Sequence, residues 1–284
     1  MEVVIAKTAG FCFGVKNAVL ETEKKLKEHS VIYCLGELVH NSRVISELNN
    51  KGLKIIEKIE EAPENSIVVI RAHGEPKVTY KKAQEKNIEI IDLTCPKVSN
   101  IHKTIEEYTS KKYFTIIIGE RTHPETIGHI GYAENVGVAS NQEELIEVIN
   151  CIEKNCISDI LIIAQTTFSI SKFNDFIIVL QNVLVDKNIV IKNTICSATK
   201  ERQEEAEKLS KQVDVVIIVG GKNSSNTKKL YDISIKNNNN CRLVENVAEL
   251  DIQDIKQFNK IGILAGASTP NNSIQEIVNI LRGE

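Results

Sequence analysis

The sequence predicts an α/β protein built from three pseudo-equivalent domains, each with a parallel sheet. Short runs of Val and Ile, almost unbroken by polar residues, alternate along the 284 residues with amphipathic segments. Such runs are typical of parallel strands that helices cover on both faces. In addition, three cysteines each stand where an apolar run ends and a helical segment begins, namely Cys12, Cys95 and Cys196. This repeat indicates three copies of one folding unit.

A shared spacing supports the repeat. A glycine lies 24 residues after each of the three cysteines, where it closes an apolar run and opens a polar loop; these glycines are Gly36, Gly119 and Gly220. A second apolar run followed by a polar loop comes later in each unit, at residues 67–74, 160–167 and 261–268. One large doubly wound sheet would also alternate strands with helices, but the identical offset favours three domains.

The predicted domain boundaries fall at the cysteines. We expect domains at residues 13–95, 96–195 and 196–284. The third unit lacks a final strand, whereas residues 1–12 begin with an apolar run that belongs to no other unit. The N-terminal strand is therefore predicted to complete the sheet of the third domain.

Helices are predicted at residues 15–28, 197–213 and 272–281, among others. The first places its apolar side chains on one stripe opposite Lys and Glu side chains. That stripe consists of Val15, Ala18, Val19, Thr22 and Leu26. The Lys- and Glu-rich stretches of these helices are expected to be solvated faces.

Composition narrows the class of protein. Hydrophobic residues make up 42% and charged residues 26% of the chain, as is usual in soluble globular proteins. A net charge of −3 and the absence of Trp argue against a nucleic-acid partner. No apolar run approaches the roughly 20 residues that span a membrane, and no secretory signal is visible. We therefore expect a cytoplasmic protein whose seven cysteines are reduced.

Polar residues gather in the loops that follow the predicted strands. In open parallel sheets, ligands bind beyond the carboxyl ends of the strands, so we expect these residues to converge. Besides the three cysteines they are His40, His73, His123, Glu125, Thr166, Thr167, Ser224, Ser225, Asn226 and Ser268. Uncharged donors beside helix N-termini predict a phosphate site, although such loops are also ordinary turn chemistry.

The three repeated cysteines are candidate metal ligands. A free cysteine is commonly a buried apolar residue, and we expect the other four, Cys34, Cys151, Cys156 and Cys241, to be structural. Three thiols at equivalent strand ends would suit zinc or an iron–sulfur cluster. Because the sequence has no Cys-x-x-Cys pair, local spacing does not decide between them.

The position of Glu125 predicts a catalytic role, whereas the positions of three histidines do not. Glu125 follows a His-Pro step in an inner loop, where burial would raise its pKa and let it donate a proton near neutrality. Thr166 is a plausible relay hydroxyl for that proton. In contrast, His29, His102 and His129 fall in or beside helices, and we expect them to be surface or structurally satisfied residues.

Together these motifs resemble the LytB/IspH family, the 4-hydroxy-3-methylbut-2-enyl diphosphate reductases. The motifs occur in the family's order along the whole chain. No single motif is decisive, but together they are specific to this family. The motifs lie at residues 10–15, 37–41, 71–74, 92–96, 123–125, 165–167, 194–203, 224–227 and 267–270. Two positions depart from the family pattern, Thr122 where Gly is expected and Phe13 where a small residue is frequent.

The resemblance implies a fold and a chemistry. Three α/β domains would surround a central [4Fe–4S] cluster held by Cys12, Cys95 and Cys196, with a fourth iron open to the substrate hydroxyl. The diphosphate would be bound by His40, His73, Ser224, Ser225, Asn226 and Ser268. His123 would lie at the substrate, and Glu125 would deliver protons with help from Thr166.

The implied reaction is a reductive dehydroxylation, the last step of the non-mevalonate isoprenoid pathway. Two electrons and two protons convert the allylic alcohol diphosphate into isopentenyl and dimethylallyl diphosphates plus water. The sequence shows no flavin or nicotinamide fingerprint, so we expect an external electron donor such as ferredoxin or flavodoxin. A zinc-dependent hydrolase of a phosphorylated substrate and a non-catalytic phosphate-ligand sensor are the alternatives.

Overall fold

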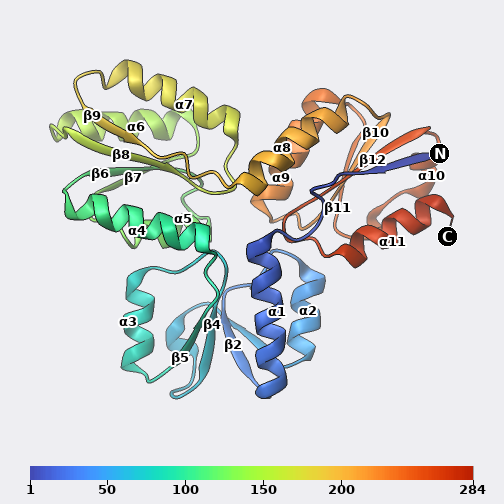
Figure 1. Ribbon diagram of the computed structural model, residues 1–284, viewed down its shortest axis with the longest axis horizontal. Helices are drawn as coiled ribbons and strands as arrows, with labels where there is room; N and C mark the ends of the chain where they lie inside the picture. The colour runs from blue at the N-terminus through green and yellow to red at the C-terminus, as the bar shows by residue number, and fades with distance from the viewer. Residues whose placement is uncertain (284) are drawn as a thin grey trace. The chain divides into compact units, whose positions relative to one another are not determined.

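The computed structural model describes residues 1–283 and contains three four-stranded sheets (Figure 1). Every strand pair is parallel, so the predicted α/β class with three parallel sheets is confirmed. The first sheet, in the order β3-β2-β4-β5, consists of β2 (Ile32–Leu35), β3 (Leu53–Ile56), β4 (Ile67–Ile70) and β5 (Glu89–Asp92). The second, in the order β7-β6-β8-β9, consists of β6 (Phe114–Ile118), β7 (Val136–Ala139), β8 (Asp159–Ala164) and β9 (Asn188–Ile191). The third, in the order β11-β10-β12-β1, consists of β1 (Glu2–Ile5), β10 (Val215–Val219), β11 (Cys241–Val244) and β12 (Lys260–Ala265).

The three sheets are copies of one pattern of hydrogen bonds. In each, the glycine that follows the first central strand donates its backbone N–H to the last residue of the neighbouring strand. These bonds are Gly36 to Ile56 at 2.8 Å, Gly119 to Ala139 at 2.9 Å and Gly220 to Val244 at 2.9 Å. The 24-residue offset in the sequence therefore corresponds to one repeated turn at the carboxyl end of each sheet.

The N-terminal strand lies at the edge of the third sheet. Strand β1 pairs in parallel with β12, from Glu2 opposite Lys260 to Ile5 opposite Ile263. It occupies the place that β5 and β9 take in the other two sheets. The domain ranges 13–95, 96–195 and 196–284 stay a prediction, and Glu284 lies outside the described residues.

The chain forms two compact units. One, here the terminal unit, comprises residues 1–23, 39–52 and those from Ser197 onward, and it contains the third sheet. The other, the central unit, comprises residues 24–38 and 53–196 and contains the first two sheets.

Helices connect the strands. They are α1 (Phe13–Glu28), α2 (Ser42–Asn50), α3 (Lys77–Glu85), α4 (Pro96–Ser110), α5 (Pro124–Ile130), α6 (Gln142–Lys154), α7 (Ile170–Val183), α8 (Ser197–Ser210), α9 (Ser225–Asn237), α10 (Ile252–Lys256) and α11 (Asn271–Arg282). Helices α1, α8 and α11 correspond to the predicted segments 15–28, 197–213 and 272–281, and α8 ends three residues earlier than predicted.

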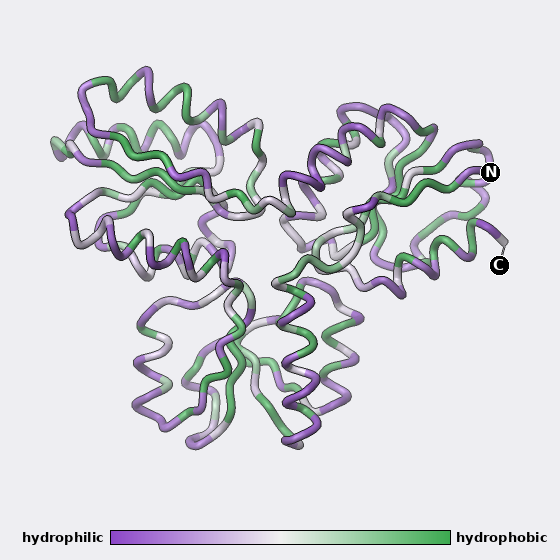
Figure 2. The backbone as a smooth tube through the Cα atoms, viewed as in Figure 1, coloured by the Kyte–Doolittle hydropathy of each residue, from purple (hydrophilic) through white to green (hydrophobic). Residues whose placement is uncertain are grey.

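The side chains of each Val and Ile run pack into two hydrophobic cores, one on each face of the sheet. In β6, Ile116 and Ile118 join the cluster that includes α6 and α7, whereas Ile117 faces the cluster that includes α4. Strand β10 alternates in the same way, because successive side chains of a strand point to opposite faces. Figure 2 shows the resulting concentration of apolar residues in the strands.

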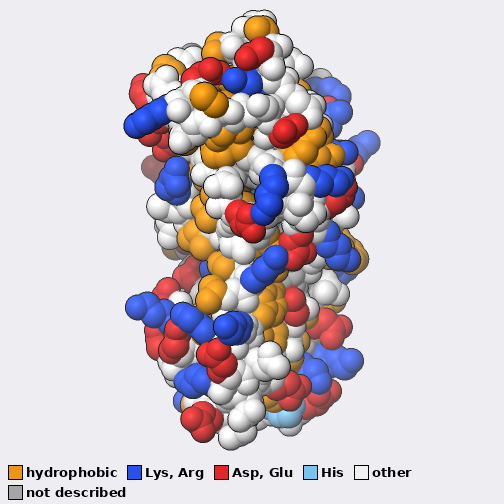
Figure 3. Space-filling model, turned by 90° about the vertical axis from the view of Figure 1, so that its left-hand side faces the viewer, with side chains coloured by type: hydrophobic (Ala, Val, Ile, Leu, Met, Phe, Trp, Pro, Cys, Tyr) orange, Lys and Arg blue, Asp and Glu red, His pale blue; other side chains and the backbone are white. Residues whose placement is uncertain are grey.

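The surface carries mixed charge. Acidic and basic side chains are interspersed on the face shown in Figure 3. Among residues 1–283, the structure contains no helix with the length and apolar character that crossing a membrane requires.

Candidate active site

The three repeated cysteines are placed by one shared hydrogen bond. Each stands just before a helix, α1, α4 or α8. The backbone N–H of each donates to a carbonyl two residues past the end of the neighbouring strand. The bonds are Cys12 to Ala267, Cys95 to Ala72 and Cys196 to Thr166, all at 3.0 Å. Each thiol is thereby held at the carboxyl end of its own sheet, where parallel sheets bind ligands.

Burial separates these thiols from the other four. Within residues 1–283 none of the seven cysteines forms a disulfide, and Cys12, Cys95 and Cys196 are half-buried. Burial raises the pKa of Cys34 to about 12 and that of Cys241 to about 11, so both thiols stay protonated. Cys151 and Cys156 are exposed at the end of α6 and do not contribute to a core. The repeated three are therefore the set that suits a soft metal centre, which binds thiolates.

The remaining predicted site residues fall into two groups, one in each unit. In the terminal unit are His40, Ser224, Ser225, Asn226 and Ser268. In the central unit are His73, His123, Glu125, Thr166 and Thr167. Each group is linked by hydrogen bonds to the loop of a repeated cysteine.

The terminal-unit group surrounds the start of α9. Ser224 caps this helix by accepting a hydrogen bond from the N–H of Thr227, and the three residues Ser224, Ser225 and Asn226 are buried. The side-chain Nδ2 of Asn226 is buried and has no hydrogen-bond partner among the described residues. A buried donor without an acceptor, beside the positive end of a 13-residue helix, is what an anionic ligand would satisfy.

Two close backbone approaches hold this group together. The Ser268 hydroxyl donates to the carbonyl oxygen of His40 at 3.2 Å. At Gly221, a Cβ atom would lie only 2.2 Å from the same oxygen, so this position requires glycine. The N–H of Cys12 bonds to the carbonyl oxygen of Ala267, next to Ser268, so the loop that carries one candidate phosphate-binding residue is hydrogen-bonded to a candidate metal ligand.

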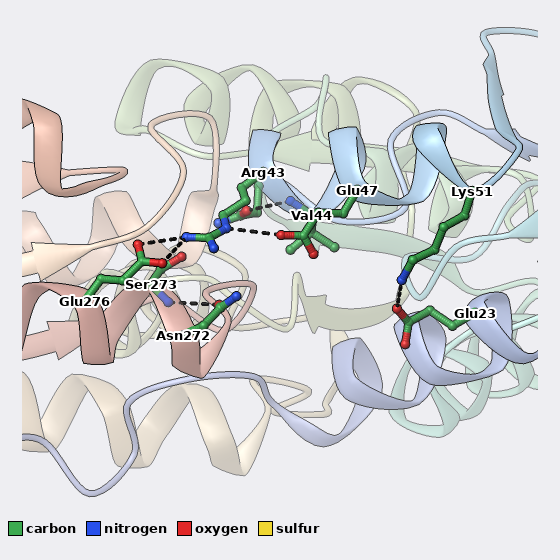
Figure 4. A network of polar contacts seen from close by, with 9 residues as sticks. Glu23, Arg43, Val44, Glu47, Lys51, Asn272, Ser273 and Glu276 are labelled. Carbon is green, nitrogen blue, oxygen red and sulfur yellow. Dashed lines mark hydrogen bonds and ion pairs between the residues drawn. The ribbon is translucent and has the colours of Figure 1, made fainter.

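Ion pairs anchor the segment that carries His40. Arg43 of α2 donates from Nη1 to both carboxylate oxygens of Glu276 on α11, each at 2.8 Å (Figure 4). Lys51 pairs with Glu23 of α1 at 2.6 Å. Exposed pairs contribute little stability each, but these two fix residues 39–52 to helices at both ends of the segment.

The central-unit group surrounds a buried carboxyl group. Glu125, in the first turn of α5, is 2% exposed. Its Oε1 accepts the backbone N–H of Thr166, and its Oε2 accepts the Thr166 hydroxyl, both at 2.6 Å. His123 caps α5 by accepting the N–H of Glu125 at Nδ1, and its ring meets that of His73 edge to face at 5.3 Å. Because Thr166 also binds the N–H of Cys196, the acid and a candidate metal ligand are joined through one residue.

The expectation of a raised pKa for Glu125 is wrong. Burial does raise the pKa of this carboxyl, but the neighbouring imidazoles of His129 and His123 and the hydrogen bond from Thr166 outweigh it and hold the pKa below its ordinary value. Donors that favour the ionised form lower a carboxyl pKa. The carboxylate is therefore the resting form, and a proton must be loaded onto it before it can be delivered.

Two of the three helical histidines do not lie at the surface. His29 is exposed, as expected, but His102 is 4% exposed and His129 is fully buried. His129 Nε2 lies 3.3 Å from Glu125 Oε1. The sequence does carry a signal for this contact, because residues four apart share one face of a helix.

Fold and site together define a class, the three-sheet α/β proteins with one half-buried thiol at the carboxyl end of each sheet. Within that class, the chain belongs to the LytB protein family, whose model matches residues 3–282. The resemblance seen in the sequence is thus confirmed.

Two relatives match over nearly their whole length. A protein of Clostridioides difficile (strain 630), called 4-hydroxy-3-methylbut-2-enyl diphosphate reductase, is 41% identical and covers 99% of both chains. One of the same name from Caldanaerobacter subterraneus subsp. tengcongensis is 40% identical, covering 98% of this chain and 96% of its own.

Solved structures agree. The reductase of Plasmodium falciparum superimposes with a TM-score of 0.90 at 30% identity, covering 99% of this chain and 87% of its own. A second structure, described as the terminal enzyme of the non-mevalonate pathway, gives a TM-score of 0.72 at 36% identity and covers both chains fully.

Proposed function

We propose that this protein is a 4-hydroxy-3-methylbut-2-enyl diphosphate reductase, the activity for which its full-length relatives are named. The observation that carries the proposal is the 41% identity over 99% of both chains, together with the three equivalent half-buried thiols. The reaction removes the allylic hydroxyl as water and takes up two electrons and two protons. Its products are isopentenyl and dimethylallyl diphosphates.

Cys12, Cys95 and Cys196 would hold one [4Fe–4S] cluster. When bound, such a cluster supplies the electrons and a Lewis-acidic iron at the departing hydroxyl. The fit rests on the donors: three soft thiols, each partly accessible at a strand end. Cys34 and Cys241 do not fit, because burial keeps their thiols protonated.

The diphosphate would bind at the start of α9. Ser224, Ser225, Asn226 and Ser268 offer buried hydroxyl and amide donors there, and the helix dipole adds positive potential. The family resemblance adds His40 and His73 to this set.

Glu125 and Thr166 would deliver protons. The Thr166 hydroxyl, bonded to Glu125 Oε2 at 2.6 Å, can pass its proton to the departing hydroxyl while Glu125 replaces it. Because Glu125 rests as a carboxylate, it must first take up a proton itself. His123 orients this pair by capping α5 at the N–H of Glu125, and we propose that its ring also contacts substrate.

The electron donor would be a small redox protein such as ferredoxin or flavodoxin, and the cytoplasmic location stays a prediction. The full-length identity to proteins named as reductases supports the reductase over the zinc hydrolase and the phosphate-ligand sensor.

Anaerobic purification with iron and sulfide assays tests the proposal. We expect a brown protein that bleaches on reduction and converts the substrate to both products with dithionite and a viologen mediator. A colourless protein that contains zinc, or a brown one without turnover, would contradict it.

The substitution Asn226→Asp tests the diphosphate site. A carboxylate at this buried position would repel the anionic substrate, and a desolvated like-charge contact costs several kcal/mol. Since about 1.4 kcal/mol is tenfold, we expect KM to rise by at least about a hundredfold with the cluster retained. Asn50→Asp, at an exposed position, should leave KM unchanged. An unaltered KM in Asn226→Asp would contradict the proposal that the diphosphate binds at the start of α9.

A further inference from the structure

A buried histidine faces the acid of the proposed mechanism from within its own helix. His129 lies one turn after Glu125 on α5, with Nε2 3.3 Å from Oε1. The two side chains are 0% and 2% exposed. Water therefore does not reach this contact, and the charge states of the two groups depend on one another.

His129 has no other hydrogen-bonding role. Among the described residues, neither of its ring nitrogens makes a hydrogen bond, and the contact with Glu125 is close enough for an ion pair without the alignment of a good hydrogen bond. A buried polar group left in this state in a native fold calls for a functional explanation. A purely structural histidine would be expected to bond to a backbone carbonyl.

The surroundings hold the His129 ring in place without competing for its proton. His102 of α4 meets it edge to face, with ring centroids 5.1 Å apart, and stacks on Tyr132 at 4.0 Å. Burial and the neighbouring His129 lower the pKa of His102 to about 4, so His102 is neutral at physiological pH.

Other charged groups lie nearby, among them Lys77, Lys103 and Glu106, which line a cleft together with His102 and Tyr132. His123 faces Glu125 from the loop before α5, and Asp92 acts on His102 from the end of β5. This cleft is open and has a volume of about 430 Å³. The cleft thus brings solvent to the two rings that pack near His129.

We propose that His129 is a positioning residue that holds the Glu125 carboxylate against Thr166 and returns a proton to it in each turnover. This inference rests on the proposed role of Glu125. The imidazolium N–H at Nε2 passes its proton to Oε1, Glu125 passes a proton to the Thr166 hydroxyl, and that hydroxyl gives its own to the departing hydroxide, which leaves as water. His129 then regains a proton from solvent, so the transfer needs no further reactant.

The substitution His129→Gln separates this role from a packing role. In the proposed relay His129 reloads Glu125, and without it Glu125 must take its proton from solvent, which offers fewer protons as the pH rises. At pH 6 we expect kcat within about twofold of the wild type. At pH 8 we expect it to be about tenfold lower, a smaller loss than the ~10²–10⁴-fold of general acid catalysis itself because Glu125 remains, with KM unchanged throughout. A packing defect would instead lower kcat by the same factor at every pH.

A second measurement does not depend on turnover. The carboxyl stretch of Glu125, identified by its absence in Glu125→Gln, reports the protonation of this group by infrared difference spectroscopy. We expect it to titrate at higher pH in His129→Gln than in the wild type, because the imidazole no longer stabilises the carboxylate. His129→Asn repeats both measurements in case the Gln variant does not fold, and His29→Gln, at an exposed site, is the matched control.

The outcomes distinguish this inference from the proposed function. If Glu125→Gln is slow but both His129 variants keep the wild-type pH profile and carboxyl titration, only the role of His129 is overturned. If Glu125→Gln turns over normally, the proposed proton donor is wrong, and the inference fails with it. A pH-dependent loss in both His129 variants, absent in His29→Gln, supports the inference.

Discussion

Cys12→Ser, Cys95→Ser and Cys196→Ser each lose most of their iron and nearly all turnover. The expectation follows from the shared geometry, in which the same backbone hydrogen bond holds each thiol at a strand end. Serine keeps the size and the backbone bond but offers a hydroxyl, which ionises far less readily than a thiol and is a poorer ligand for iron. Iron and sulfide per chain, measured after anaerobic reconstitution, would show the loss directly.

The other four cysteines provide the control. Cys34→Ala, Cys151→Ala, Cys156→Ala and Cys241→Ala should keep both iron and turnover. At the two buried positions, Cys34 and Cys241, the lost side chain leaves a small cavity, and we expect a lower melting temperature without loss of the cluster. A full cluster in Cys95→Ser, or no cluster in Cys241→Ala, would contradict the assignment of Cys12, Cys95 and Cys196 as the cluster ligands.

Glu125→Gln should bind substrate almost normally, retain the cluster and turn over at least about a hundredfold more slowly, within the ~10²–10⁴-fold range of general acid catalysis. Glutamine preserves the shape and can still accept the hydrogen bonds of Thr166, but it cannot carry the proton. A group that acts only in the transition state is lost from kcat and not from KM. Single-turnover kinetics on reduced enzyme would measure this, and unreacted substrate should accumulate on the protein.

The lowered pKa of Glu125 gives this prediction a pH signature. Because the carboxylate is the resting form, the fraction loaded with a proton grows as the pH falls, and wild-type kcat should rise with it. Glu125→Gln should lose that dependence. Glu143→Gln, which removes an exposed first-turn acid of α6, should match the wild type. Normal kcat with a raised KM in Glu125→Gln would make Glu125 a positioning residue, and another group would have to supply the proton.

Much of the fold could be predicted because its signals are local. A strand buried on both faces must be apolar at successive residues, so β6 and β10 are visible as Val and Ile runs. The turn after each first central strand needs a glycine, because a Cβ atom at Gly36, Gly119 or Gly220 would lie 2.3 to 2.8 Å from a neighbouring side chain. The three cysteines follow from the same repeat, and no contact had to be known to find them.

The electrostatic state of the site could not be predicted in this way. The sequence places Glu125 in a buried loop, which alone would raise its pKa, but the donors that reverse the shift come from Thr166, 41 residues away, and from the packing of α5. The burial of His102 likewise depends on Tyr132 and His129. The sequence by itself determined the repeated architecture and the candidate ligands, because both follow from the spacing of residues and from local hydropathy. Only the tertiary structure decided which groups are charged and which histidine meets the acid, because a pKa depends on neighbours that folding brings together.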